Sequence, residues 1–270
     1  MFRRILTLIL VLGSSVAYAQ RAPDMATLDR GDGITKFGFD LGFSSLEEPP
    51  YSAALRFDIY GQYVTDSGLG IYGDLPISRS FGGDGEPCPP QFCNATGLGN
   101  LDLGLLYVRS GETLSWVFRG GAALPTSNDG PFDGLTRVLA TGPRLTDIAL
   151  ASNDWYFRLS VSPLIHLDRV FLRADIGLDI DIGSEDYHLL RINAGGGIDL
   201  GTVALSLELV NTATFGDFDG NDEDFYHALA FTVRFMGEQL QPFLSVGTPI
   251  DEYRRDVIKF WIAGGLQVAF

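Results

Sequence analysis

The stretch "GDFDGNDED", residues 216–224, gathers oxygen-bearing side chains that could bind a metal ion. Its candidate ligands are Asp217, Asp219, Asn221, Asp222 and Asp224. Closely spaced oxygens around a flexible glycine suit calcium. The stretch lacks the glutamate at the twelfth position of an EF-hand loop, and the residues on either side alternate like strands. We expect either a calcium site or a solvated acidic loop, and no other cofactor.

Two cysteines, Cys88 and Cys93, lie five positions apart in "CPPQFC", within a stretch rich in proline and glycine. In an oxidising compartment such a pair favours a small disulfide that closes a loop. A metal site would need two further soft ligands, and the neighbouring sequence has none. We therefore predict a Cys88–Cys93 disulfide.

The three histidines, His166, His188 and His227, give little support for catalysis. Nucleophilic catalysis on a lipid would need a serine beside a histidine, with a third group that orients the histidine. His166 falls in a short turn, and neither His188 nor His227 is followed by a serine in step with it. We expect no enzymatic activity.

Over much of the chain, apolar and polar residues alternate with a period of two, which is the period of a β-strand. In "VFLRADIGLDIDI", residues 170–182, the even-numbered positions are apolar, and the odd-numbered ones include Arg173, Asp175, Asp179 and Asp181. A slip of one residue would move these charges to the apolar face, so the pattern specifies the facing strongly.

The alternation predicts about twelve strands, most of them near the roughly 9 to 11 residues with which a tilted strand crosses a bilayer. We expect strands at residues 34–43, 53–63, 69–78, 98–108, 113–124, 153–165, 170–182, 188–200, 202–211, 225–236, 240–248 and 256–270. After the first link, short links alternate with longer polar ones such as 79–97, 125–152 and 212–224. This wiring is typical of an all-β fold, a closed antiparallel transmembrane β-barrel of the bacterial outer membrane.

If the apolar face meets lipid, the opposite face lines the lumen of the barrel. The candidate lumen residues, eight basic and nine acidic, are Lys36, Asp40, Arg56, Asp58, Asp74, Asp102, Arg119, Arg158, Arg173, Asp175, Asp179, Asp181, Arg191, Asp199, Glu208, Arg234 and Lys259. The lumen is thus predicted to be nearly neutral, and the acidic excess of the chain to lie mainly in the loops.

A nearly neutral lumen is compatible with two functions. One is a narrow polar channel or transporter that passes small solutes. The other is a closed structural or surface-interaction barrel, with arginines and carboxylates paired inside and acidic extracellular loops that bind cations or a partner. Twelve strands lie between the packed eight-stranded and the open sixteen-stranded barrels, so size does not separate the two. Residues 20–32 are too few for a substantial plug, so closure would come from paired lumen residues or from an inward-folded loop such as 125–152.

The first residues, "MFRRILTLILVLGSSVAYAQ", read as a secretory signal peptide, with Arg3 and Arg4, an apolar stretch at residues 5–12 and a small-x-small site before Gln20. We expect residues 1–19 to be removed and residues 20–270 to form the barrel. Without Arg3 and Arg4, 17 of the 19 basic residues remain against 34 acidic ones, a formal charge of −17. This charge argues against binding of nucleic acid through a basic patch.

The last residues, "LQVAF", place Leu266 and Val268 at alternate positions before the terminal Phe270. They resemble the C-terminal signal that the barrel assembly machinery recognises, with Val268 where a tyrosine is common. The predicted partners are therefore this machinery, outer-membrane lipid and lipopolysaccharide, and a small-molecule solute.

Two further stretches, "GLGNLDLGLLY" at residues 97–107 and "ALPTS" at residues 123–127, resemble patterns in the transporter barrels associated with the meta-pathway of phenol degradation. That family tends to have aspartate where this chain has Asn100, and glycine where it has Ser127. The resemblance implies uptake or export of small, including hydrophobic, molecules.

Overall fold

The computed structural model describes residue 25 and residues 30–47, 51–82, 94–128, 133–183, 187–216 and 225–270. Its strands are β1 (Lys36–Leu46), β2 (Tyr51–Val64), β3 (Leu69–Gly82), β4 (Thr96–Leu98), β5 (Leu101–Arg109), β6 (Leu114–Leu124), β7 (Tyr156–Leu167), β8 (Val170–Asp181), β9 (Tyr187–Asp199), β10 (Val203–Gly216), β11 (Phe225–Phe235), β12 (Leu240–Pro249) and β13 (Ile258–Ala269). The helical segments are α3 (Asp133–Leu139), η1 (Gly142–Asp147), α4 (Ile148–Ala151) and α5 (Glu252–Val257). No helix in these ranges is long and apolar enough to cross a membrane.

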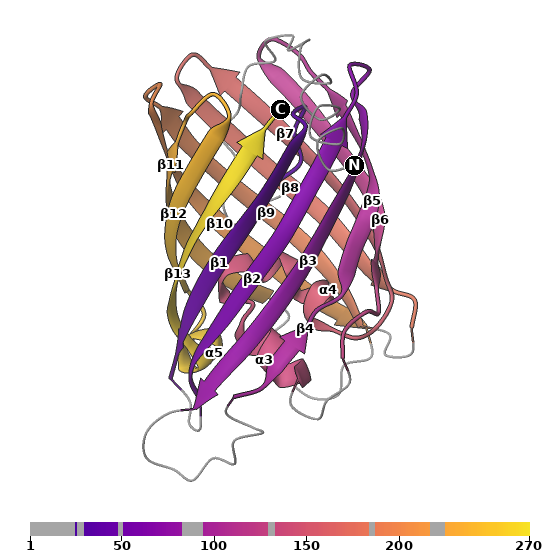
Figure 1. The fold of residues 1–270 in the computed structure, drawn as a ribbon, viewed down its shortest axis with the longest axis vertical. Helices are drawn as coiled ribbons and strands as arrows, with labels where there is room; N and C mark the ends of the chain where they lie inside the picture. Colours follow the sequence, from indigo (N-terminus) through magenta and orange to yellow (C-terminus); the bar gives the residue numbers. More distant parts are fainter. Residues whose placement is uncertain are drawn as a thin grey trace, which may run out of the picture.

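The strands close into a barrel, drawn in Figure 1. All strands except β4 pair antiparallel with the next strand of the ring, and β13 returns to pair with β1, from Lys36 opposite Ala269 onward. Closure continues past the ladder, because the Phe270 amide donates to the Thr35 carbonyl at 2.9 Å. The short β4 adds only to β3. The predicted closed antiparallel barrel of about twelve strands is confirmed.

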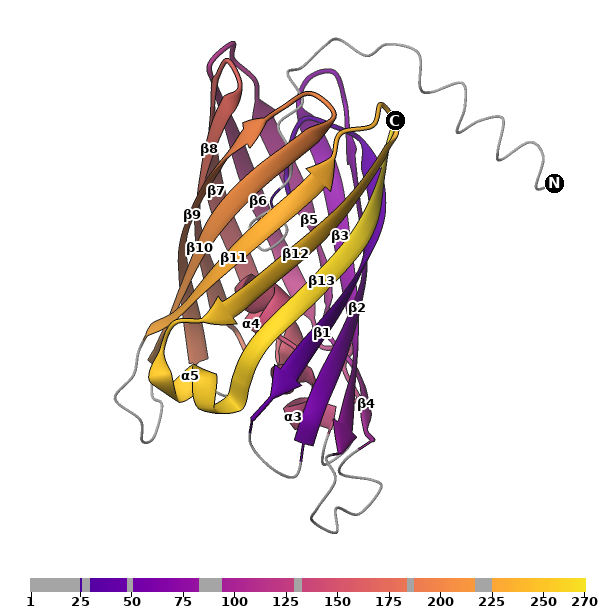
Figure 2. The same ribbon diagram turned by 90° about the vertical axis from the view of Figure 1, so that its left-hand side faces the viewer.

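The two ends of the barrel differ. Five short links lie at the end that holds the C-terminus, and the helices lie at the opposite end (Figures 1 and 2). Two of the short turns contain Gly68 and Gly201 with φ of 84° and 88°, a conformation that costs glycine little. We call these the turn end and the loop end; in outer-membrane barrels the short turns face the periplasm.

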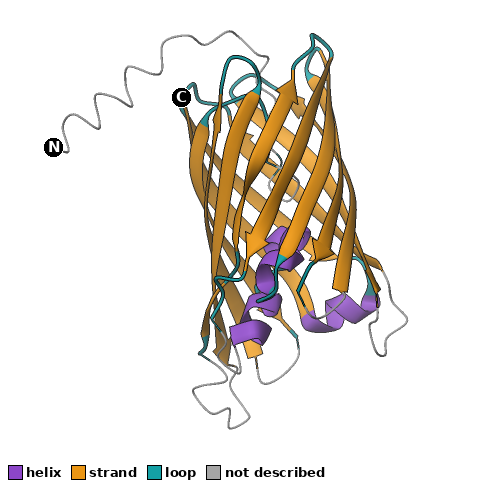
Figure 3. Cartoon of the chain, turned by 90° about the vertical axis from the view of Figure 1, so that its right-hand side faces the viewer, coloured by secondary structure: helices purple, strands orange, loops and turns teal. Residues whose placement is uncertain are grey.

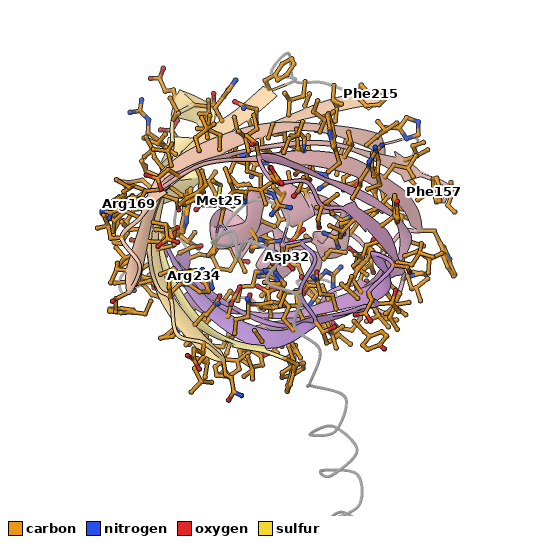
Figure 4. All side chains as sticks on the ribbon, turned by 90° about the horizontal axis from the view of Figure 1, so that it is seen from above. Met25, Asp32, Phe157, Arg169, Phe215 and Arg234 are labelled. Carbon is orange, nitrogen blue, oxygen red and sulfur yellow. The ribbon has the colours of Figure 1, made fainter. Side chains whose placement is uncertain are left out.

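The two faces of the wall are inverted relative to a soluble protein. Along β1, Phe37, Phe39 and Leu41 are 50%, 41% and 52% exposed, whereas Lys36 and Asp40 are 3% and 5% exposed. Figure 4, a view along the barrel axis, shows the same inversion, with Phe157 and Phe215 outside the ring of strands and Asp32 and Arg234 inside it. Lipid is the environment that such an outer face requires.

At the start of β13 the parity prediction for Lys259 is wrong. The ladder between β1 and β13 shifts register, so that Ser45 faces Phe260 and Leu46 faces Ile258. This irregularity leaves Lys259 and Phe260 both on the outer face, and Lys259 forms an exposed ion pair with Glu47. A bulge inserts one residue and reverses the facing of everything on one side of it.

Candidate functional site

The lumen is the candidate site, and the structure places most of the predicted lumen residues inside it. The residues found buried on the inner face are Lys36, Asp40, Arg56, Asp58, Asp74, Asp102, Arg158, Arg173, Asp175, Asp179, Asp181, Arg191, Glu208 and Arg234. Arg119 is also directed inward, because its guanidinium lies 3.7 Å from the Tyr72 ring centroid and 3.9 Å from an Asp102 carboxylate oxygen. Asp199 is half-buried at the turn end, where it accepts a hydrogen bond from the Gly201 amide.

Arginines and carboxylates of the wall form a connected web of ion pairs. Arg158 on β7 contacts Asp102 on β5 at 2.5 Å and Asp179 on β8 at 3.1 Å. Asp179 in turn contacts Arg191 on β9 at 3.0 Å. Buried charges of this kind are stable only when paired, so each member fixes the position of its neighbours.

The segment that links β6 to β7 folds into the lumen from the loop end, and its described residues are 125–128 and 133–155. We call this segment the inward loop. Figure 3 shows its helices within the outline of the barrel. Pro143 of η1 lies directly against β1, where a Cβ added at Gly42 would be 2.4 Å from Pro143 Cγ. Because only glycine leaves room there, the wall of β1 is shaped for this segment. This link, residues 125–152 in the predicted strand pattern, is the one that the sequence predicts could fold inward and close the lumen.

Asp147, at the end of η1, ties this inward loop to the web. Its carboxylate contacts Arg144 at 2.9 Å, Arg56 on β2 at 3.2 Å and Arg158 on β7 at 3.4 Å. Burial alone would raise the pKa of the Asp147 carboxyl, but Arg144, Arg56 and Arg158 hold that pKa well below its ordinary value. Asp147 is therefore an anion that joins two distant strands through the loop.

Apolar packing adds to the hold on the inward loop. Leu145 belongs to a buried cluster with Ile258, Trp261, Ala228 and Ala230 of the wall. Ala149 and Leu150 of α4 are fully buried in a second cluster, against Ala123, Tyr156 and Leu189. The loop thus packs against two separate parts of the barrel interior.

The two stretches that resemble the phenol-degradation barrels meet at this loop. The Asn100 amide nitrogen of the side chain donates to the Ala149 and Asp154 carbonyls at 3.3 and 2.8 Å, and the Asn100 backbone amide donates to the Leu150 carbonyl at 2.9 Å. Thr126 Oγ1 accepts from the Leu101 amide at 2.8 Å and donates to the Gly99 carbonyl at 3.2 Å. Both stretches therefore anchor the inward loop to the wall.

A short segment before β1, residues 30–34, also lies in the lumen. Lys36 Nζ and the Gln62 side-chain amide reach opposite oxygens of Asp32, at 2.9 and 2.7 Å. Arg173 on β8 donates to the Gly31 carbonyl at 2.6 Å. Residues 20–32 are predicted to be too few for a substantial plug, and the described residues 30–32 of this region lie buried inside the barrel.

Little space remains between these groups. A cavity of about 30 Å³ is lined by residues of the web and of both inserted segments, among them Arg30, Tyr60, Asp74, Arg119 and Asp147. A volume of this size is on the scale of a single water molecule. Wall residues and both inserted segments thus meet around this cavity.

Three predicted features lie elsewhere. Cys88 and Cys93, the calcium candidates Asp217, Asp219, Asn221, Asp222 and Asp224, and the signal peptide at residues 1–19 fall outside the described residues, so they stay predictions. Within the described ranges, no group of three or more His, Cys, Asp or Glu side chains is arranged to hold a metal ion. His166 extends β7 instead of forming a turn, and His227 Nδ1 lies 2.8 Å from Asp251 at the loop end.

Comparisons with known proteins identify the architecture. A solved outer-membrane channel from Pseudomonas putida F1 superposes with a TM-score of 0.64, over 93% of this chain and 100% of that one, at 13% identity. The NanC porin gives a TM-score of 0.54, over 87% and 98% of the two chains, at 8% identity. The chain has the fold of the bacterial outer-membrane β-barrels.

The KdgM porin extends the likeness, with a TM-score of 0.51 over 87% of this chain and 99% of that one, at 10% identity. Together with its apolar outer face, the fold places this protein in the bacterial outer membrane, as the sequence predicts. No protein-family model and no curated protein matches the chain. The resemblance to the phenol-degradation barrels therefore stays a prediction.

Proposed function

We propose that the protein is an outer-membrane channel that passes small solutes through a polar lumen, and that its own inserted segments close the lumen at rest. The observation that carries this proposal is that the lumen is occupied by segments that are not part of the barrel wall. Residues 30–34 and the inward loop are separate from the wall and contact it through side-chain hydrogen bonds, ion pairs and apolar packing. In this proposal the protein has no catalytic role.

The size of the barrel supports this interpretation. An eight-stranded barrel is filled by the side chains of its wall, whereas a ring of twelve strands encloses more space. Here that extra space is taken up by segments that can shift without breaking the wall. A polar lining of buried arginines and carboxylates would then meet water and hydrophilic solutes. The resemblance to the phenol-degradation barrels adds small hydrophobic compounds as candidate solutes.

The alternative is a permanently closed barrel whose acidic loops bind a cation or a partner. The small residual cavity favours it. Solute flux separates the two functions, because a permanently closed barrel passes none.

The test is single-channel conductance of the refolded protein in a planar bilayer, with a cysteine pair at Ser44 and Gly142 to lock the inward loop to β1. A Cβ added at Gly142 would lie 2.7 Å from Ser44 Oγ, so cysteines at these two positions bring their sulfur atoms within reach of a disulfide. In a background with Cys88 and Cys93 replaced by serine, we expect conductance steps that oxidation suppresses and a reductant restores.

Ser44→Cys alone is the matched control, and oxidation should leave its conductance unchanged. An inserted protein that is silent in wild-type form and in every variant would overturn the channel and favour the closed barrel.

A further inference from the structure

Four neighbouring strands carry a lumenal carboxylate at the same level. Asp40 on β1 is the direct cross-strand partner of Asp58 on β2, and Asp74 on β3 is the direct partner of Asp102 on β5. Asp58 lies two residues from Tyr60, which faces Asp74. Like charges directly opposite each other destabilise a sheet, so each pair requires a cation.

The two carboxylate pairs are neutralised by arginines from different parts of the molecule. Asp102 contacts Arg158 and Arg119, both of them wall residues. Asp40 and Asp74 instead share Arg30, which belongs to the segment before β1. One part of this carboxylate belt is thus neutralised by a group that is not built into the barrel wall.

Arg30 is held as a ligand would be. Its Nη2 bonds to Asp40, its Nη1 lies 2.7 Å from Asp74 Oδ2, and Asp58 Oδ2 lies 4.0 Å from Nη2. The Tyr60 ring covers the guanidinium at 3.9 Å from its centroid. Carboxylates at the edges of a guanidinium and an aromatic ring over its face form the standard recognition set for an organic cation.

The site has acceptor capacity that Arg30 does not use. Asp40 Oδ1 and Asp74 Oδ1 are buried without a hydrogen-bond donor, although the two residues are only 5% and 8% exposed. A buried oxygen without a donor costs free energy, so a ligand with more N–H groups would be favoured here. The cavity of about 30 Å³ adjoins Arg30, Tyr60 and Asp74 and is the size of one water molecule, so Arg30 has to leave before a larger cation can enter.

We propose that Asp40, Asp58, Asp74 and Tyr60 form a binding site for small organic cations that carry a guanidinium or a primary ammonium group, and that Arg30 is a tethered occupant which such a solute displaces. The proposal rests on the proposed channel function and names its substrate class. The aromatic ring favours an organic cation over a metal ion.

Arg56 sets a limit on the charge of the site. It contacts Asp58 at 2.8 Å and also reaches Asp147, so Asp58 keeps a wall partner after Arg30 leaves. Asp40 and Asp74 would keep only the weaker attraction of Arg144, with Arg234 also near Asp40, so these two carboxylates would attract a cationic solute. A tethered competitor acts at an effective concentration in about the millimolar range, so removal of Arg30 should raise the apparent affinity strongly.

The test uses agmatine, a small compound with one guanidinium and one ammonium group, on the full-length mature protein in a planar bilayer. Relative to wild type, Arg30→Gln should increase the permeability ratio of cations to anions. It should also lower the agmatine concentration that half-blocks the current by about tenfold or more. The double variant with Arg30→Gln and Asp74→Asn should lose this gain.

Arg191→Gln is the matched control, because it also removes one lumenal guanidinium from between carboxylates. Asp179 keeps Arg158 at 3.1 Å, and Asp175 keeps hydrogen bonds from Ser162 and Asn193, so this variant vacates no comparable site. Agmatine block should change less than twofold in this variant. A tenfold gain there as well would overturn the assignment to Asp40, Asp58 and Asp74.

Failure of the site and failure of the channel are distinguishable. Conducting Arg30→Gln channels with the wild-type response to agmatine would overturn the cation site and leave the channel intact. Silent channels in every variant would overturn the channel, and calorimetric titration of detergent-solubilised Arg30→Gln with agmatine would then decide the site by itself.

A second measurement does not depend on folding of the variant. In the wild-type protein, agmatine should increase hydrogen exchange of the backbone amides at residues 31–34, whereas an uncharged alkylurea should not. Unchanged exchange at saturating agmatine would overturn displacement of Arg30.

Discussion

The two segments inside the barrel are held in different ways. The inward loop combines three ion pairs at Asp147 with fully buried Ala149 and Leu150 and with hydrogen bonds from Asn100. Residues 30–34 rely on polar contacts, chiefly those of Arg30 and Asp32. Water can replace polar contacts once a segment moves, but it cannot replace apolar burial. The inward loop is thus held more firmly than residues 30–34, so residues 30–34 should leave their place in the lumen more readily.

The largest expected effect comes from Asp147→Ala. It leaves Arg56, Arg144 and Arg158 without their shared anion, and removal of one partner from a buried ion-pair group costs about 3–5 kcal/mol. The free energy of unfolding, measured with urea in lipid vesicles, should fall by this amount. Arg30→Gln should cost much less, because its segment can leave and admit water to the carboxylates. Equal losses would contradict the distinction between the two segments.

Acid should loosen the inward loop. The folded pKa of Asp147 lies well below its ordinary value of 3.8, so its ion pairs contribute stability above about pH 3.8, and that contribution is lost as the pH falls further. Hydrogen exchange at residues 142–151 should therefore increase below this pH. Asp147→Asn should show no such transition, and a wild-type loop with constant protection down to about pH 2 would contradict the assignment.

A moderate effect is expected at Asn100. Asn100→Ala removes the two hydrogen bonds to the Ala149 and Asp154 carbonyls, at a cost of about 1–3 kcal/mol. Asn100→Asp, which introduces the residue that the resembled family tends to have, should cost at least as much, since a carboxylate cannot donate to these carbonyls. Urea unfolding measures both variants, and a stabilising Asn100→Asp would contradict the role of the Asn100 side chain as a hydrogen-bond donor to the loop.

The smallest effect is expected at Lys259, outside the barrel. Its ion pair with Glu47 is about half exposed on both sides, and exposed pairs contribute about 0–1 kcal/mol. Lys259→Gln should also leave ion selectivity unchanged, in contrast to Arg30→Gln. A shift in reversal potential would place Lys259 near the solute path and contradict the bulge.

Much of the wall could be predicted from the sequence, because period-two alternation depends only on which face meets lipid. It located every strand of the ring to within a few residues and directed Arg158, Asp179 and Glu208 inward. It failed at Lys259, where the bulge shifts parity and has no signature in the local pattern.

Alternation says nothing about segments that are not strands, so Arg30, Arg144 and Asp147 were missed as lumen residues. The sequence of the predicted polar link, residues 125–152, does contain one indication of burial. The run of Ile148, Ala149, Leu150 and Ala151 is apolar in a loop that should be solvated, which indicates burial. Its position inside the barrel still required knowledge of Asn100 and Ala123, which are distant in the sequence.

The pairing of Lys36 with Ala269 has a consequence for how the molecule is made. One edge of β1 can pair only with β13, which is the last strand of the chain. The contacts that close the ring therefore have close to the greatest sequence separation that the chain allows. Contacts of this kind form slowly, and until they form two open edges can recruit strands from other molecules. Efficient biogenesis should therefore depend on the unfinished chain being kept apart from its neighbours until the ring is complete.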